Sequence, residues 1–413
     1  MDYFKHTDVA RNFKVSTKTV SNWLDAAKAG TNNLSLHHDG RYYHIRDTPE
    51  NRLIMEKLAQ KARRYQTANP YQVIRPRPEF YTIYSRRQRL DIITNLNNGE
   101  IPRQYNYMQD GAINWDNWLK RLANEESSNI LKGTVELIRA NMESIDRLLE
   151  GKKKVNVIDL GVGNAYPVKE MLGHLIERNV LHRYIAIDIS RRMLEVAERN
   201  IKEWYGDDIK FEGYERDIAY EHFDDLLVDD MLGKDADETI NLVLLLGATP
   251  LNFRSFSDVF RPVHASMGHG DLLMYTGKPD TEVARRYFDF NSSPGASKLP
   301  ASHKYILDLL NIDESLYDAE MGFDQTLRMR YIRVRLKKAI TLQFGFGDSE
   351  ERSVNLEQGD TILLLRVWHL TALEIITEFE RSGFTLLQSS LTRDRQYFLS
   401  ISGVEAKGEI EST

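Results

Sequence analysis

The chain has 413 residues, of which 41% are hydrophobic and 28% charged, with a net charge of −6 and no cysteine. Its length predicts two or three domains, and the lack of cysteine excludes a disulfide framework, a thiolate metal site and a cysteine nucleophile. No apolar run reaches the roughly 18 residues of a membrane helix and no signal-peptide pattern opens the chain, so we expect a cytoplasmic protein that makes no membrane contact.

Residues 1–48 predict a small unit of two helices and a hairpin. One helix is expected over 7–13 and a second over 17–27, with a turn at Val15-Ser16 between them. Asp39-Gly40 then supplies the positive φ that a tight hairpin turn requires. The spacing resembles the winged or MerR-type helix-turn-helix of phage terminase small subunits and excisionases. That resemblance implies that Thr17, Lys18 and Ser21 open a recognition helix for the major groove of double-stranded DNA, with the hairpin as the wing.

The next segment is strongly basic. Residues 51–104 contain eleven Lys or Arg and four Asp or Glu, whereas the rest of the chain is acidic overall. A helix is expected over 51–66, followed by a proline-punctuated linker. A basic front on an acidic body predicts that any polyanion is met by the front. Because residues 1–48 are themselves nearly neutral, a protein-interaction role for this front stays open.

An alternation of strands and helices dominates the middle of the chain, after an aromatic and acidic segment from Gln104 and a long helix over about 129–149. Strands are expected at 155–160, 184–187, 209–214, 240–246 and 271–275, with helices at 167–178 and 193–205 between them. This order predicts right-handed βαβ crossovers and a parallel doubly wound sheet. A helix over 371–382 and a hairpin of 386–390 and 396–401 close the pattern.

A glycine-rich turn follows the first of these strands. Asp159, Gly161 and Gly163 stand where the strand gives way to a helix, and glycine lets the backbone approach a ligand closely there. Tyr166 occupies the third glycine position of a dinucleotide fingerprint, so the turn need not hold a diphosphate.

Acidic residues end the second and third strands. Asp188 is placed to accept both ribose hydroxyls of a nucleoside, and Asp217 to accept from an adenine amino group while Ile218 packs against the ring. Together with the glycine turn they predict an adenosyl pocket without a phosphate cradle. The competing interpretation is a structural turn with helix-capping aspartates, which explains each residue singly but not the set.

Residues 104–403 resemble the histidine-specific methyltransferases of ergothioneine biosynthesis. The similar motifs are Gly247-Ala-Thr249-Pro-Leu-Asn252-Phe253, Tyr105-Asn-Tyr107-Met-Gln-Asp-Gly111 and Arg285-Arg-Tyr287-Phe-Asp289. The resemblance implies an α/β, class I (Rossmann-like) methyltransferase fold with an inserted α+β substrate lobe, and S-adenosylmethionine as cofactor.

The same resemblance implies roles for individual residues. Asn252 and Tyr287 would hold the amino and carboxylate groups of an amino acid, Tyr107 would lie near the reacting nitrogen, and Gly247 and Thr249 would contact the cofactor. The chemistry is an in-line displacement at the sulfonium methyl that needs no metal.

One departure from the family bears on the substrate. The family reads imidazole with a Glu-x-Ser-x-Lys stretch, but here the run is Leu365-Arg-Val367-Trp-His369. Apolar side chains replace both imidazole-reading groups, so histidine is not the expected substrate. We expect Trp368 in the core and Arg366 exposed.

The expected domains are 1–48 helix-turn-helix, 49–104 basic helix and linker, 105–280 cofactor-binding domain with a helical lead-in, 281–370 substrate lobe, 371–403 closing helix and hairpin, and 404–413 tail.

Three hypotheses about function stand. The chain is a methyltransferase for a small-molecule or peptide amine with a DNA-binding or interaction domain, a DNA-binding regulator or defence protein that senses the cofactor or a metabolite without turnover, or a nucleic-acid methyltransferase. The last is disfavoured because the segment after strand four lacks an Asp/Asn-Pro-Pro-Tyr motif. A homodimer is also expected.

Overall fold

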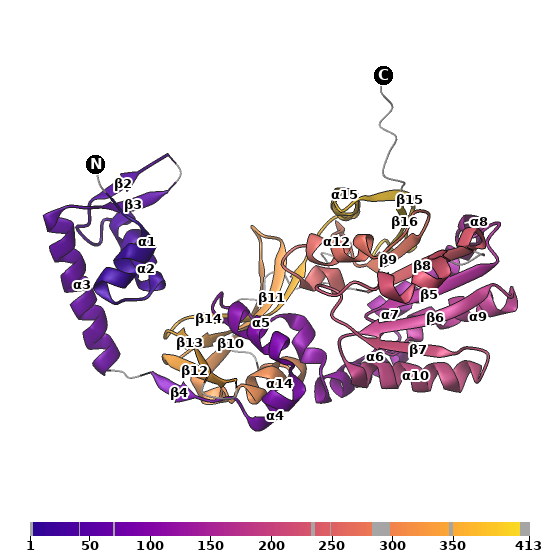
Figure 1. Ribbon diagram of the computed structural model, residues 1–413, viewed down its shortest axis with the longest axis horizontal. Coiled ribbons are helices and arrows are strands. Elements are labelled where there is room, and N and C mark those ends of the chain that lie inside the picture. The colour runs from indigo at the N-terminus through magenta and orange to yellow at the C-terminus, as the bar shows by residue number, and fades with distance from the viewer. Residues whose placement is uncertain are drawn as a thin grey trace, which may run out of the picture. The chain divides into compact units, whose positions relative to one another are not determined.

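The protein divides into two compact units (Figure 1). The structure is a computed structural model that describes residues 3–40, 42–68, 71–232, 236–247, 249–282, 298–346 and 350–404. The first unit comprises Met1–Val73 with Lys338–Thr341, and the second comprises Ile74–Lys337 with Leu342–Thr413.

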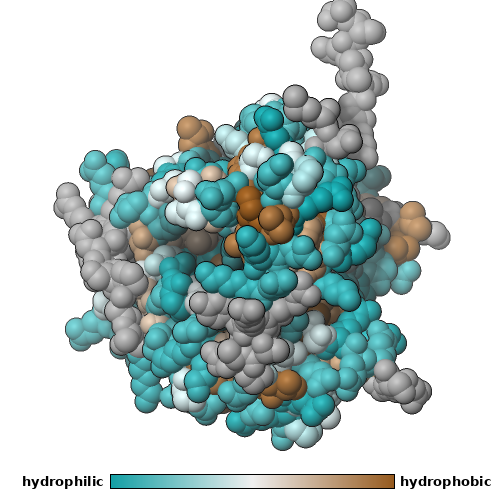
Figure 2. All heavy atoms as spheres, turned by 90° about the vertical axis from the view of Figure 1, so that its left-hand side faces the viewer, coloured by the Kyte–Doolittle hydropathy of each residue, from teal (hydrophilic) through white to brown (hydrophobic). Residues whose placement is uncertain are grey.

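One face of the molecule is mostly polar (Figure 2). Hydrophilic residues cover most of the face seen in Figure 2, where hydrophobic residues form small, separate groups. Within the described ranges, no helix combines the length and the apolar character that a membrane crossing requires.

The first unit is a set of helices packed with a small sheet. Its elements are β1 (Tyr3–Phe4), α1 (His6–Phe13), α2 (Thr17–Lys28), β2 (Leu36–His38), β3 (Tyr43–Arg46) and α3 (Pro49–Ala68), and β4 (Gln72–Ile74) follows at the unit boundary. Lys14 ends α1 in the left-handed conformation (φ 53°), and the Ser16 hydroxyl caps α2 by accepting the Thr19 N–H at 3.0 Å. Val9, Trp23 and Ile45 meet in the core, so both helices bury one face against β3.

The hairpin of this unit turns where the sequence predicts it. Asp39 Oδ1 accepts the Tyr42 N–H at 2.6 Å, and Gly40 has a φ of +95°. The strand order β1-β3-β2 places β3 in the centre of an antiparallel sheet.

Residues 78–96, expected as part of a linker, instead form helices in the second unit. These are α4 (Pro78–Ile83) and α5 (Arg86–Leu96). Pro78 stands at the start of α4, where its missing N–H costs little, and Ser85 forms a capping box with Gln88. A proline can therefore open a helix as well as mark a linker, which local sequence does not distinguish.

The second unit is built on a seven-stranded sheet. Its strands are β5 (Lys154–Leu160), β6 (Leu181–Asp188), β7 (Phe211–Glu215), β8 (Thr239–Leu246), β9 (Leu272–Gly277), β15 (Phe384–Leu391) and β16 (Phe398–Val404). The order is β15-β16-β9-β8-β5-β6-β7. The five strands from β9 to β7 in this order are parallel, whereas β16 runs antiparallel to β9 and to β15. The closing hairpin therefore makes the sheet mixed, not wholly parallel.

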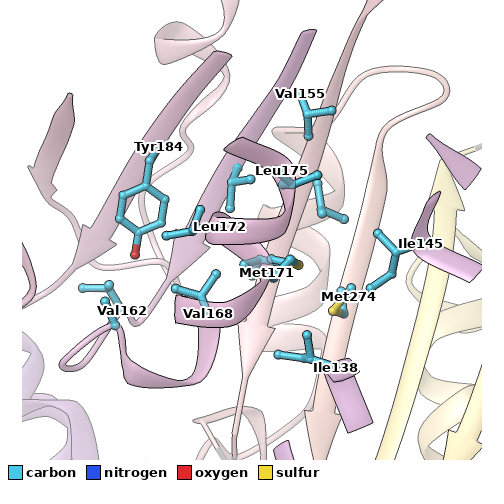
Figure 3. Packing of buried hydrophobic residues seen from close by; sticks show 14 of the residues in the cluster. Ile138, Ile145, Val155, Val162, Val168, Met171, Leu172, Leu175, Tyr184 and Met274 are labelled. Atoms are coloured by element: carbon cyan, nitrogen blue, oxygen red, sulfur yellow. The ribbon is translucent and has the colours of Figure 1, made fainter. Parts of the chain in front are cut away.

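Both faces of the sheet carry helices, which explains why its central strands are continuously apolar. On one face α7 (Ile130–Ala140), α8 (Met142–Leu148), α9 (Lys169–Glu177) and α10 (Arg191–Tyr205) pack against alternate strand residues such as Leu242 and Leu244. Figure 3 shows part of this packing. On the other face α12 (Ser257–Ala265) and α15 (Ala372–Arg381) pack against Val243 and Leu245.

The long helix predicted over about 129–149 is wrong in one respect, because the chain forms α7 and α8 with a break at Asn141. The Asn141 side chain donates to the Leu137 carbonyl and to Ser390 Oγ, both at 2.7 Å, and accepts from Gln388 Nε2 at 2.9 Å. These bonds tie the break to β15, a contact that local periodicity does not report.

The remaining elements of the second unit surround the sheet or form the lobe. They are η1 (Arg103–Tyr107), α6 (Asp110–Asn124), η2 (Tyr166–Val168), η3 (Asp224–Leu226), α11 (Val228–Leu232), η4 (Ala236–Glu238), η5 (Thr249–Asn252), α14 (Ala301–Leu309), η6 (Glu314–Leu316), β10 (Tyr317–Asp324), β11 (Met329–Leu336), β12 (Ile340–Gly345), β13 (Glu351–Leu356) and β14 (Thr361–Trp368). In the lobe, β10, β11 and β14 form an antiparallel sheet with β11 in the centre.

Candidate functional site

A cavity lies at the carboxyl ends of β5, β6 and β8, where ligands bind in open α/β sheets. Nine residues predicted from the sequence are among those that line it: Tyr107, Gly161, Gly163, Asp188, Asp217, Ile218, Gly247, Thr249 and Asn252. The structure therefore brings together, in one cavity, residues that are up to 145 positions apart in the chain.

The glycine turn after β5 forms the floor of the cavity, and its backbone requires glycine. Gly161 and Gly163 have φ values of +68° and +56°. A Cβ on Gly161 would lie 3.7 Å from Thr249 Oγ1, and a Cβ on Gly163 would lie 3.6 Å from Trp115 Nε1. The turn is thus flanked closely by the loop after β8 and by helix α6.

Asp188 ends β6 and turns its carboxylate toward the same turn. Its Oδ1 accepts the Ser190 N–H at 2.9 Å and its Oδ2 accepts the Gly163 N–H at 3.4 Å. Burial raises the pKa of Asp188 to about 6. In the described part of the chain no lysine or arginine pairs with this carboxylate, so its oxygens retain acceptor capacity for hydroxyl donors.

Asp217 lies two residues beyond the end of β7. Its Oδ1 accepts the Ala219 N–H at 3.2 Å, and burial raises the pKa of Asp217 to about 6. Ile218, which is 8% exposed, lines the cavity beside it. An acceptor and an apolar side chain are thus adjacent, as the recognition of an adenine ring requires.

Asp159 differs from the other predicted acids, because it is not among the residues that line the cavity. It is 4% exposed, and its Oδ2 accepts from the Tyr184 hydroxyl at 2.9 Å. Burial raises the pKa of Asp159 to about 7. The structure thus places this carboxyl behind the glycine turn, where it contacts Tyr184, and not at the cavity surface where the sequence pattern put it.

The wall opposite the strand ends is aromatic. The Tyr107 hydroxyl accepts from Arg103 Nε at 3.1 Å, and the Tyr107 ring meets Trp115 edge-on with centroids 5.3 Å apart. The ring centroids of Trp115 and Trp118 are in turn 4.6 Å apart. Asn252, at the end of η5, lines the cavity from the loop after β8. Tyr287 lies outside the described residues.

A family model confirms the fold and the chemistry that these features indicate. The model for histidine-specific, S-adenosylmethionine-dependent methyltransferases matches residues 89–402, which is well over half of the chain. The chain belongs to this family. It is an S-adenosylmethionine-dependent methyltransferase, and S-adenosylmethionine is its cofactor. The mixed seven-stranded sheet is the class I, Rossmann-like architecture of such enzymes.

Solved structures similar to the chain include three methyltransferases. An S-adenosylmethionine-dependent methyltransferase from Clostridium acetobutylicum ATCC 824 is 12% identical, with 70% of this chain and 99% of that one covered and a TM-score of 0.37. The magnesium protoporphyrin IX methyltransferase from Synechocystis PCC 6803 is 13% identical, with 73% of this chain and 98% of that one covered and a TM-score of 0.36. The glycopeptide N-methyltransferase MtfA, in complex with S-adenosylmethionine, is 12% identical, with 66% of this chain and 94% of that one covered and a TM-score of 0.33. No curated protein matches the chain.

Several cavity residues of this methyltransferase were not anticipated from the sequence. They include Arg103, Trp115, Trp118 and Thr134. The two tryptophans carried a usable signal, because residues three apart on a helix share one face. Nothing in the local sequence of Arg103 indicates that it is buried.

The expectation that Arg366 is exposed is wrong. Its side chain is 11% exposed, and its Nη2 lies 2.6 Å from Glu100 Oε2. Glu100 also binds Arg254 Nε at 2.7 Å and forms a β-bridge with Leu363 of β14, so Arg366 is held by a buried carboxylate from a segment distant in sequence. Trp368 packs against the core, as expected, and its Nε1 donates to the Phe253 carbonyl at 2.8 Å.

The residues predicted to contact DNA lie in the first turns of α2, in the first unit. Thr17 and Lys18 are exposed, whereas Ser21 is half-buried and donates to the Thr17 carbonyl at 3.2 Å. Ser21 also borders a shallow pocket with Lys28 and Tyr43.

Proposed function

We propose that this methyltransferase transfers a methyl group to the amine of an amino-acid-like or peptide substrate other than histidine. The observation that carries the proposal is that Tyr107 and Asn252 line the same cavity as Asp188 and Asp217. The residues suited to an adenosine and those suited to an amine acceptor thus share one space.

The strand-end residues suit the cofactor. Asp188 and Asp217 have free acceptor capacity for ribose hydroxyls and an adenine amino group, and Gly161 and Gly163 leave room for the backbone to approach a ligand. When bound, the cofactor supplies an electrophilic methyl group. The part of these residues is to hold and orient it, because in-line transfer depends on alignment.

The opposite wall suits the acceptor. Asn252 offers an amide donor and acceptor, and Tyr107 offers a hydroxyl held by Arg103. The rings of Trp115 and Trp118 line the same cavity with their centroids 4.6 Å apart, and aromatic rings of this kind suit a cation such as a sulfonium. The acceptor nitrogen must be neutral to attack, so we expect an amine and not a quaternary centre as the nucleophile.

The lobe supports a substrate other than histidine. Leu365 and Val367 stand on β14 where family members carry the groups that read imidazole, and neither side chain can form a hydrogen bond. Trp368 and Arg366 do not compensate, since Trp368 donates to Phe253 and Arg366 pairs with Glu100.

We propose that the first unit is a winged helix-turn-helix that binds double-stranded DNA. Three residues separate α1 from α2, the Ser16 cap starts α2, and Thr17 and Lys18 are exposed on its first turn. The β2–β3 hairpin supplies a candidate wing.

Calorimetry followed by an acceptor screen tests the enzymatic proposal. We expect the full chain to bind S-adenosylmethionine and S-adenosylhomocysteine, and to methylate members of a panel of amino acids and peptides but not histidine. Tight cofactor binding without turnover on any amine would instead favour a sensor of the cofactor, and turnover on histidine would refute the substrate proposal.

DNA binding needs a separate experiment with a labelled pool of duplex DNA. We expect Lys18→Ala to weaken binding. It should also reduce the slope of log affinity against log salt concentration by about the amount that one phosphate contact contributes. Asp25→Ala, on a later turn of α2 and paired with Lys28, is the matched control and should not weaken binding. Salt-insensitive binding, or equal effects of both variants, would contradict a major-groove role for α2.

A further inference from the structure

Arg103 is a buried cation that borders the cavity. The residue is 9% exposed, and no other lysine or arginine in the described ranges is as deeply buried. Its Nε donates to the Tyr107 hydroxyl at 3.1 Å, and its guanidinium lies 4.9 Å from the centroid of the Tyr107 ring. Its Nη1 is buried without a hydrogen-bond partner, and among the described residues no carboxylate forms an ion pair with it.

Two other partly buried arginines of this unit, Arg366 and Arg183, are paired with carboxylates. Arg366 pairs with Glu100 at 2.6 Å, and Arg183 pairs with Glu212 and Asp230 at 2.6 and 2.7 Å. A buried charge without a counter-ion opposes folding, because the protein interior replaces the hydration of the ion poorly. Such a charge lowers the stability of the folded protein unless a ligand of opposite charge binds to it.

His303 lies close enough to Arg103 for the arginine to lower its pKa, and its ring supplies no negative charge to offset the arginine. His303 is 6% exposed, and its Nε2 has no partner. Burial, together with the positive charges of Arg103 and Arg330, lowers the pKa of His303 to about 3, so this ring is neutral near pH 7. The amide of Asn106, which is 1% exposed, also has no partner at either atom. An anion that enters the cavity would therefore meet a cation that no carboxylate of the described residues neutralises.

We propose that Arg103 binds a carboxylate of the methyl acceptor, which makes the acceptor an amino acid or a peptide with a free carboxylate. The inference rests on the proposed function, in which Tyr107 lies beside the reacting amine. A carboxylate is also present at the methionyl end of the cofactor. We assign the acceptor because Arg103 stacks on Tyr107 and belongs to the same short helix, η1, and not to the strand ends that suit the adenosine.

The first arm of the test measures stability without any ligand. We expect Arg103→Met to raise the thermal midpoint of the full chain by about 2 °C or more, because it removes an uncompensated buried charge. Arg366→Met is the matched control and should lower the midpoint, because it takes a partner from the buried Glu100 carboxylate. Arg103→Lys keeps the charge and should not raise the midpoint.

The second arm separates the two carboxylates by titration. S-Adenosylhomocysteine carries the methionyl carboxylate and 5′-methylthioadenosine lacks it, so we expect Arg103→Met to leave the affinity for both unchanged. Paired probes are then titrated into the complex with S-adenosylhomocysteine: L-tyrosine with tyramine, and L-glutamine with its decarboxylated amine. We expect the wild-type chain to bind at least one amino acid about tenfold more tightly than its amine, and Arg103→Met to lose this preference, with partial rescue by Arg103→Lys.

The outcomes are distinct. Weaker binding of S-adenosylhomocysteine but not of 5′-methylthioadenosine by Arg103→Met would assign the arginine to the cofactor and overturn the proposal. A lower midpoint for Arg103→Met, or no preference of the wild-type complex for any amino acid over its amine, would overturn it as well. Failure of the wild-type chain to bind S-adenosylhomocysteine would instead refute the proposed function.

Discussion

The two walls of the cavity are built in different ways. The wall of Asp188, Asp217 and the glycine turn stands at the ends of parallel strands, and its polar groups are held by nearby backbone N–H groups. The opposite wall comes from η1, α6 and η5, and its groups are held by one another, as where Arg103 donates to Tyr107 and Trp115 packs between Tyr107 and Trp118.

The difference separates what a fold provides from what one enzyme requires. Strand ends meet at one edge of any doubly wound sheet, so the first wall follows from topology. The second wall depends on segments that no sheet register positions, and we expect it to determine the acceptor. Mutations on the first wall should therefore act on cofactor binding, and those on the second on turnover.

The largest effect is expected for Asp188→Ala. Hydrogen bonds to a charged group contribute about 1.5–3 kcal/mol each, so losing two to ribose hydroxyls should weaken S-adenosylhomocysteine binding at least about 100-fold in calorimetry. The thermal midpoint at pH 8 should change little. The pKa of Asp188, about 6 when folded, exceeds its unfolded value, so the ionised carboxylate opposes folding above pH 6 and its removal offsets the lost backbone bonds. Unchanged binding would refute the adenosine assignment of this wall.

Asn252→Ala should act on the other wall. We expect turnover to fall by about 100-fold while the affinity for S-adenosylhomocysteine stays within about twofold, because misplacing the acceptor costs alignment and not cofactor contacts. Transfer of a labelled methyl group measures the first quantity and calorimetry the second. Asn98→Ala, which removes an exposed amide that donates to the Thr94 carbonyl, is the control and should change neither. Full turnover by Asn252→Ala would disprove the amino-acid-like acceptor.

The pH dependence of cofactor binding sharpens the comparison. Burial raises the pKa of both Asp188 and Asp217 to about 6. An ionised carboxylate can accept hydrogen bonds at both oxygens, whereas a protonated carboxyl carries a hydrogen on one of them and accepts fewer hydrogen bonds from hydroxyl and amino groups. The affinity for S-adenosylhomocysteine should be constant above about pH 7 and should fall below pH 6, by about tenfold at pH 5 for each carboxyl that must lose its proton. Asp188→Asn should retain only the Asp217 part of this fall. An affinity that rises on acidification would contradict the model of two ionised acceptors.

The smallest effect is expected at the glycine turn. Gly163→Ala places a side chain at a φ of +56°, which should cost about 1–2 kcal/mol of unfolding free energy, and its Cβ would approach Trp115. Gly151→Ala carries a similar penalty at +81° in a turn with open space around it. Denaturant unfolding should show comparable losses for both variants, whereas only Gly163→Ala should also weaken S-adenosylhomocysteine binding, by about threefold to tenfold. Equal affinities would show that the turn does not touch the ligand.

Local patterns in the sequence were sufficient to predict that Asp188, Asp217 and the glycine turn share one cavity, and to predict the elements that carry them. Alternating strands and helices, a glycine pair after one strand and acids after the next two predict a shared edge, because parallel strands align their ends. The same patterns predict Asp159 at the cavity surface, whereas the residue accepts a hydrogen bond from Tyr184 and does not line the cavity. A strand-end acid can face either way, and only packing decides which.

The sequence by itself determined the class of fold and predicted the edge of the sheet where an adenosyl pocket lies, since both depend on residues close together in the chain. The resemblance to a family supplied S-adenosylmethionine as the cofactor. Tertiary structure alone decided that Arg366 pairs with Glu100, that Asn141 breaks a helix against β15, and that Arg103 lies buried over Tyr107. Each depends on a contact between segments distant in sequence or on the exclusion of water from a charge, and neither has a periodicity that a reader of the sequence can detect.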